Sequence, residues 1–173
     1  MSKLPEYKLD RIFDAPRELV WRAWTDPKLL HRWYGPNVET IIHQFDLQPG
    51  GSWLNEMKWG SNSMFSKMVF QEVVRPSLLV WHHYSFTDSE WNIAPNPKMA
   101  DWPRKLLTTV AFEELGDKTN VRLTQIPMEA TDAEIACFAA AMAGMNQGWG
   151  AGYAIMAELF VELQTEAGLK NER

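Results

Sequence analysis

The sequence has one cysteine, Cys137, few positive charges, and no long apolar run. A single cysteine excludes an intrachain disulfide and any metal site built from several cysteines. No stretch approaches the roughly 18 apolar residues of a transmembrane helix, so no membrane span is predicted. Lysine and arginine together number 17 against 22 aspartates and glutamates, without any basic run. This balance argues against a nucleic-acid partner.

The N-terminal residues lack the apolar core of a signal peptide, so we expect a cytoplasmic protein. The middle of the chain shows no repeat, low-complexity tract or linker, and 173 residues suit one domain, expected to span residues 1–173. Hydrophobic residues make up 46% of the chain, which excludes wholesale disorder.

Tryptophan and methionine are abundant, with nine of each. Tryptophan is bulky, and its single N–H needs a partner when it is buried. These side chains either build a large aromatic core or line a partly hollow interior together with flexible thioethers. Composition leaves both interpretations open.

The spacing of apolar residues predicts one strand, two short helices, six further strands and a long helix, in that order. Asp14 and Asp26 are candidate N-caps of the short helices, and Thr131 with Glu134 has the spacing of a capping box. We expect strands at 7–14, 39–46, 52–59, 64–74, 78–86, 105–114 and 119–126, a helix at 132–165, and a frayed tail at 166–173.

The order of these elements predicts the fold class. Strands that follow one another through tight turns favour an antiparallel sheet, and the single amphipathic helix must cover one of its faces. The fold class is therefore α+β. Residues 87–104 form a long, proline-rich connection, and loops of this length are often lids or contact surfaces.

Four glycines, Gly144, Gly148, Gly150 and Gly152, fall in the middle of the long predicted helix. Each costs about 1 kcal/mol relative to alanine in a helix interior. A break near Gly144, a close approach of the helix backbone to the sheet, or space beside Trp149 for a guest molecule would each explain them. The sequence leaves these three explanations open.

Three histidines on predicted strands are candidates for acid–base chemistry or ligand contact. His82 and His83 are adjacent, so they point to opposite faces and cannot both reach one cavity. If the sheet buries the face that carries Ile41 and Phe45, His43 points inward too. There it either carries a proton near neutral pH or is satisfied by its neighbours. No His-x-His or His-Glu-x-x-His pattern occurs, so no metal site is expected.

Four motifs occur in an order and spacing that resemble a known family. They are Phe13-Asp14-Ala15-Pro16 within residues 11–27, Arg32-Trp33-Tyr34-Gly35-Pro36, Pro49-Gly50-Gly51-Ser52-Trp53, and Gln147-Gly148-Trp149. They resemble the activator of heat-shock protein 90 ATPase homologue-like family, within the START-like (SRPBCC) superfamily that has the birch-pollen-allergen fold. The resemblance covers about residues 7–163, and the chain departs from the pattern at 87–104 and at His82-His83.

The resemblance implies a helix-grip architecture, in which a curved antiparallel sheet of six or seven strands wraps around the C-terminal helix. Across the superfamily, the space between sheet and helix takes apolar molecules. The resemblance implies no single reaction, and no cofactor is expected. The candidate cavity residues are Trp33, His43, Trp53, Asn55, Met57, His82, Met142, Met145, Asn146, Trp149 and Tyr153.

Three hypotheses of function follow. The first is the binding of a small apolar or amphipathic molecule in an internal cavity. The second is an enzyme, such as a cyclase, dehydratase or hydrolase, that acts on an apolar carbonyl compound with His43 or His82 as acid or base and Tyr153 as donor. The third is a co-chaperone-like module that contacts a chaperone ATPase. The sequence does not decide the ligand, the reaction, or whether the chain forms a homodimer.

Overall fold

A computed structural model describes residues 3–171 and contains the expected elements in the expected order. The helices are α1 (Arg17–Thr25), α2 (Pro27–Trp33) and α3 (Asp132–Asn171). The strands are β1 (Tyr7–Phe13), β2 (Glu39–Phe45), β3 (Ser52–Trp59), β4 (Asn62–Val74), β5 (Leu78–Thr87), β6 (Leu106–Leu115) and β7 (Lys118–Pro127). The predicted α+β class is confirmed.

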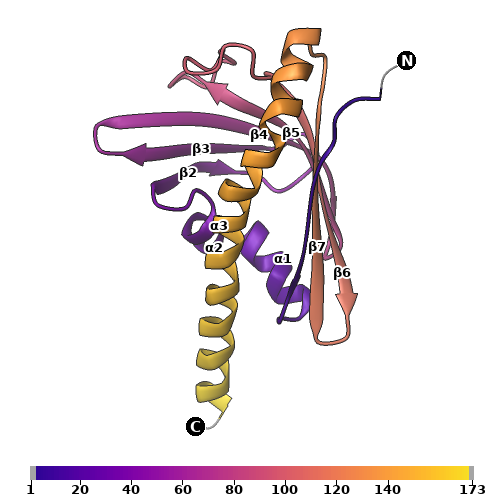
Figure 1. Cartoon of the computed structure of the whole chain (residues 1–173). Coiled ribbons are helices and arrows are strands. Elements are labelled where there is room, and N and C mark those ends of the chain that lie inside the picture. Colours follow the sequence, from indigo (N-terminus) through magenta and orange to yellow (C-terminus); the bar gives the residue numbers. More distant parts are fainter. Residues whose placement is uncertain (1–2, 172–173) are drawn as a thin grey trace.

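The strands form one antiparallel sheet in the order β1-β7-β6-β5-β4-β3-β2. The sheet bends strongly, so that β2, β3 and β4 run almost at right angles to β6 and β7 (Figure 1). Helix α3 lies in the angle between these two arms, and α1 and α2 sit beside it. This arrangement is the expected helix-grip fold.

The helix starts follow the local sequence with one exception. Asp26 caps α2 through its side chain, which accepts a hydrogen bond from the Lys28 amide at 3.0 Å. Thr131 and Glu134 form both hydrogen bonds of the predicted capping box. The prediction that Asp14 caps α1 is wrong. The N-cap is Pro16, and within residues 3–171 no side chain makes a capping hydrogen bond to α1, because Asp14 lies two residues too early.

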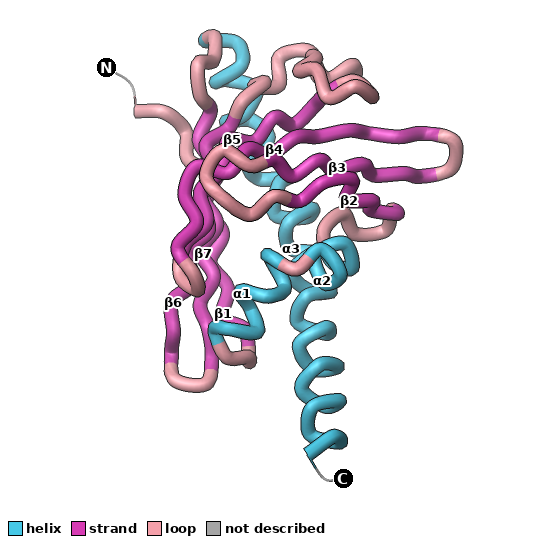
Figure 2. The backbone as a smooth tube through the Cα atoms, turned by 180° about the vertical axis from the view of Figure 1, so that it is seen from behind, coloured by secondary structure: helices cyan, strands magenta, loops and turns pink. Residues whose placement is uncertain are grey.

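Helix α3 is continuous over 40 residues, which corresponds to about 60 Å. The break considered near Gly144 is absent. The helix also runs through residues 166–171, where we expected a frayed tail, while 172–173 lie outside the described residues. Its last turns extend past α2 (Figure 2). Within residues 3–171, no helix combines the length and the apolar composition that crossing a bilayer requires.

A chain of fully buried tryptophans fills the core beside α1 and α2. The ring of Trp24 contacts that of Trp33, with centroids 4.6 Å apart, and it also contacts Trp81 at 6.2 Å. The ring of Trp81 in turn meets that of Trp53 at 5.9 Å. This part of the interior is therefore a packed aromatic core.

Strand β2 contains a bulge that reverses one expectation. Ile42 pairs with Asn55, but the next paired residue is Gln44, which faces Leu54, so His43 is the extra residue. A bulge shifts the alternation of side chains by one position. Ile42 and Phe45 therefore pack against the core, whereas His43 is exposed. The expectation that His43 points inward is wrong for this reason.

Candidate functional site

A pocket of about 810 Å³ lies between the middle of α3 and the sheet, and it opens to solvent. Strands β3 to β7, the segment after α2 and the loop before β6 all contribute to its walls. Its apolar lining contains four tryptophans, and these are Trp33, Trp59, Trp102 and Trp149. The other apolar lining residues are three methionines, a tyrosine, a leucine, a proline and a valine, namely Met57, Met64, Met145, Tyr34, Leu106, Pro36 and Val38.

Three glycines of α3 lie four residues apart and line this pocket: Gly144, Gly148 and Gly152. Residues at this spacing share one helix face. A Cβ atom added at Gly144 or Gly148 would meet no atom within 4 Å, whereas one added at Gly152 would lie 3.1 Å from the carbonyl oxygen of Trp33. Open space is found at Gly144 and Gly148. The close approach at Gly152 is to the end of helix α2, where Trp33 lies, and not to the sheet as one explanation required.

His83 is the histidine that lines the pocket, and its neighbour His82 belongs to the opposite face of β5. The indole N–H of Trp81 donates a hydrogen bond to Nδ1 of His83 at 3.1 Å. Indole is a donor only, so Nδ1 accepts and the proton of the neutral ring is on Nε2. Burial lowers the pKa of His83 to about 4, which keeps the ring uncharged at neutral pH.

Other polar groups of the pocket come from neighbouring strands. Gln125 on β7 donates a hydrogen bond to Thr108 at 3.1 Å, and the Trp102 indole donates to Ser85 at 3.1 Å. Ser66 on β4 also lines the pocket. None of the lining residues, all within the described part of the chain, is lysine, arginine, aspartate or glutamate. The pocket therefore offers neutral hydrogen-bonding groups within an aromatic enclosure.

The structure places four of the predicted cavity residues in the pocket lining: Trp33, Met57, Met145 and Trp149. Trp33 is held firmly, because its indole N–H donates to the carbonyl oxygen of Ala23 at 2.8 Å. The rings of Trp149 and Trp24 stack with centroids 6.2 Å apart. The aromatic core thus sets the position of two walls of the pocket.

Trp53, Asn55 and Tyr153 lie in the packed core and do not line the pocket. The Trp53 indole donates to the Asn55 side-chain oxygen at 3.2 Å. The side-chain nitrogen of Asn55 and the hydroxyl of Tyr153 are buried and have no hydrogen-bond partner among the residues that the structure describes. Burial raises the pKa of Tyr153.

Met142, Asn146, His82 and His43 also lie outside the pocket lining. Met142 packs against the core, and Asn146 accepts a hydrogen bond from the Tyr7 hydroxyl at 2.8 Å. Met142 and Asn146 belong to a broad stripe along α3. The pocket lies only along the part of α3 that carries Gly144, Gly148 and Gly152. His43 is excluded by the bulge in β2.

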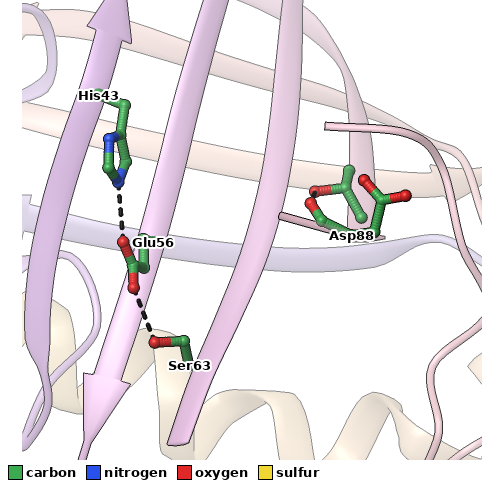
Figure 3. Close-up of polar contacts among 5 residues, drawn as sticks. His43, Glu56, Ser63 and Asp88 are labelled. Carbon is green, nitrogen blue, oxygen red and sulfur yellow. Dashed lines mark hydrogen bonds and ion pairs between the residues drawn. The ribbon is translucent and has the colours of Figure 1, made fainter. Parts of the chain in front are cut away.

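His43 instead joins a polar cluster on the outer face of the sheet (Figure 3). Its Nε2 lies 2.8 Å from Glu56, and the Ser63 hydroxyl donates to the same carboxylate at 2.7 Å. The hydrogen bond from Ser63, followed by that from His43, lowers the pKa of Glu56. Nucleophilic catalysis needs the serine to bond to the histidine. Here Ser63 bonds to the carboxylate instead, so the cluster lacks that arrangement.

Several lining residues were not among the predicted ones, notably Ser66, His83, Trp102 and Gln125. Alternation along β5 limits the pocket to one of the two adjacent histidines, but it does not say which. Trp102 comes from the long loop, where no periodicity exists. These assignments required the fold.

The chain is similar to one known protein family and to several solved structures. A family model described as Activator of Hsp90 ATPase homolog 1-like protein matches residues 14–161. A crystal structure from Mycobacterium smegmatis is similar with a TM-score of 0.74 and 18% identity, over 91% of this chain and 95% of that one. A solution structure from Arthrobacter aurescens has a TM-score of 0.72 and 22% identity, over 88% and 86%.

A crystal structure from Nitrosomonas europaea has a TM-score of 0.70 and 20% identity, over 95% of this chain and 99% of that one. At these identities the structural similarity shows the fold alone. No curated protein matches the sequence. The family model covers most of the chain, and the helix-grip fold agrees with it, so this protein belongs to the Activator of Hsp90 ATPase homolog 1-like family.

Proposed function

We propose that this protein binds a small apolar or amphipathic molecule in the pocket between α3 and the sheet. The observation that carries the proposal is the open space at Gly144 and Gly148, where the helix lacks side chains and the pocket holds about 810 Å³. Ligand sites of soluble proteins typically measure roughly 300–1,000 Å³ and combine apolar walls with a few polar groups. This pocket has that size and composition.

Gly144 and Gly148, the two pocket glycines beside open space, lower the stability of the helix, and this cost supports the proposal. Each gives up about 1 kcal/mol of helix stability relative to alanine, although a Cβ would meet no atom at either position. Packing in the free protein therefore does not require them. Their effect is to leave room in the pocket.

The aromatic lining supplies the driving force for binding. A ligand that buries about 300 Å² of apolar surface gains about 7.5 kcal/mol from its transfer out of water. Part of this gain offsets the lost freedom of the ligand. The rigid rings of Trp33 and Trp149 lose little conformational entropy on binding, because the core already holds both.

The enzyme hypothesis draws less support from the geometry. It requires His43 or His82 as acid or base and Tyr153 as donor, and none of these residues lines the pocket. The acid–base pair that it names is therefore not assembled there.

Gly148→Phe tests the proposal, because its side chain enters the pocket from α3. Gly150→Phe is the matched control: it also lies in the interior of α3, meets no atom within 4 Å and does not line the pocket. Nile red, an uncharged dye whose emission rises in apolar surroundings, serves as the probe. We expect Gly148→Phe to weaken its binding about tenfold or more, with Gly150→Phe close to the original protein.

The melting temperatures of both variants verify that the fold is intact. Equal dye binding by the two variants, or no binding by the unaltered protein, would contradict the proposal.

A further inference from the structure

The polar part of the pocket has one donor whose direction is fixed. His83 is 8% exposed, and its Nδ1 is occupied by the Trp81 indole N–H, so its proton is on Nε2. Within residues 3–171, the structure shows no hydrogen bond to this Nε2, and His83 lines the pocket. Trp81 is itself fully buried, which holds the imidazole ring in place.

A donor that lines the pocket without a partner among residues 3–171 has a consequence for the ligand. A guest that covers Nε2–H without accepting its proton removes water from the donor and leaves it unsatisfied. A guest with a suitably placed oxygen restores the hydrogen bond. The pocket therefore discriminates between ligands of equal shape according to whether they carry an acceptor.

The charge of the pocket points to the class of acceptor. Among the described residues that line the pocket, none is lysine, arginine, aspartate or glutamate, and His83 is uncharged at neutral pH. A carboxylate or an ammonium group entering the pocket would lose hydration without gaining a counter-charge. The site thus disfavours ions of either sign.

We infer that the pocket selects uncharged ring compounds that carry a carbonyl oxygen, and that Nε2–H of His83 donates to this oxygen. The inference rests on the proposed function and adds the ligand class. The flat rings of Trp33 and Trp149 would enclose the body of such a ligand, while the histidine sets its orientation.

The test compares three probes with one naphthalene skeleton and the same substitution position: acetylnaphthalene, ethylnaphthalene and naphthoate. Calorimetric titration at pH 7.5 gives their affinities for the full chain. We expect acetylnaphthalene to bind about three- to tenfold more tightly than ethylnaphthalene, which is the worth of one neutral hydrogen bond. Naphthoate is expected to bind most weakly.

Two substitutions of His83 distinguish the role of its Nδ1 from the role of its Nε2. In His83→Asn the side-chain oxygen takes the place of Nδ1 and can accept from Trp81, but the group at Nε2 is lost. In His83→Gln the amide nitrogen reaches toward the position of Nε2. We expect the ratio of acetylnaphthalene to ethylnaphthalene affinity to fall to about one in the asparagine variant and to recover in part in the glutamine variant.

An unchanged ratio in His83→Asn, or naphthoate binding as tightly as acetylnaphthalene, would overturn the inference. If the ketone and the hydrocarbon bind equally to the original protein, and Gly148→Phe weakens both, the proposed function stands and the inference is wrong. If none of the three probes binds while Nile red does, the inference is wrong and the proposed function stands.

Discussion

His82 and His83 are neighbours in β5, yet their surroundings differ sharply. His83 is almost fully buried beneath the pocket, and burial lowers its pKa to about 4. His82 is partly exposed on the other face, and its pKa is lowered mainly by burial and secondarily by the charge of Lys105. One step along a strand therefore separates a neutral pocket donor from a surface group.

The buried His83 makes the stability of the protein depend on pH. Its pKa in the folded protein, about 4, is lower than the unfolded value near 6.5. Between these values the unfolded chain binds a proton that the folded chain does not, so stability is lost as pH falls. His83→Asn removes this titration. We expect the loss of unfolding free energy between pH 7 and pH 4.5 to be smaller by roughly 2–3 kcal/mol in the variant.

Urea titration at the two pH values measures this difference, and acidic groups elsewhere affect both proteins alike. Equal losses of free energy in the variant and the original protein would show that His83 is not held neutral by burial.

Gly150 and Gly152 lie in the same helix, but only Gly152 is in close contact. An alanine at Gly150 meets no atom within 4 Å, so it is expected to stabilise the helix by about 1 kcal/mol and to raise Tm by roughly 2–4 °C. An alanine at Gly152 places its Cβ 3.1 Å from the Trp33 carbonyl oxygen. We expect this contact to cancel the gain, so that Gly152→Ala melts below Gly150→Ala.

Calorimetric melting of the two variants beside the original protein gives both shifts. An equal rise in Tm for both alanines would contradict the close approach at Gly152.

Among the elements, α3 is unevenly anchored along its length. From residue 132 to 150, all of them described, Phe138 is the one buried residue. From residue 151 to 160, five are buried: Gly152, Tyr153, Met156, Leu159 and Phe160. Local opening is easiest where few apolar contacts hold an element. The first half of α3 is therefore the more loosely held half, and it covers the pocket.

Amide hydrogen exchange tests this difference. We expect residues 132–147 to exchange faster than residues 152–160 in the free protein, because fewer buried side chains hold them. Acetylnaphthalene at saturating concentration is expected to slow exchange mainly in the first half, since the ligand fills the space beneath it. Equal exchange in both halves of the free helix would show that α3 is anchored uniformly.

Strand β2 shows how an element departs from its own pattern. The alternation of residues 39–46 predicted that Ile41, His43 and Phe45 share a face. The pairing of β2 with β3 introduces a bulge at His43, so that Ile42 and Phe45 face inward. The bulge is a property of the strand pair, and the sequence of β2 alone carries no signal for it.

In the molecule as a whole, the same residue types serve two purposes. Trp24, Trp53 and Trp81 pack ring against ring beside the short helices, whereas Trp59 and Trp102 line the open pocket. Trp53 and Trp59 both belong to β3, near its start and at its end, so the core and the pocket adjoin along the same strand. The two interpretations of the tryptophan content, a packed core and a hollow interior, therefore apply to different parts of one protein.

The order of the elements, their approximate bounds, the antiparallel sheet and the covering helix all followed from the sequence. Alternation, helical spacing and signals such as Asp26 and the Thr131–Glu134 capping box act between near neighbours, so the chain itself carries them. The helix-grip arrangement was predicted from the resemblance of four motifs to a known family. These features predicted Trp33 and Trp149 as walls of a cavity, and both line the pocket.

The tertiary structure alone decided which face of β5 lies inward, where β2 bulges, and which glycines of α3 stand over open space. Each depends on how segments far apart in the chain are spaced and paired, and a local pattern does not encode a distance between such segments. His83 became a pocket donor, and His43 a surface group, because strand pairing and the bend of the sheet set their positions.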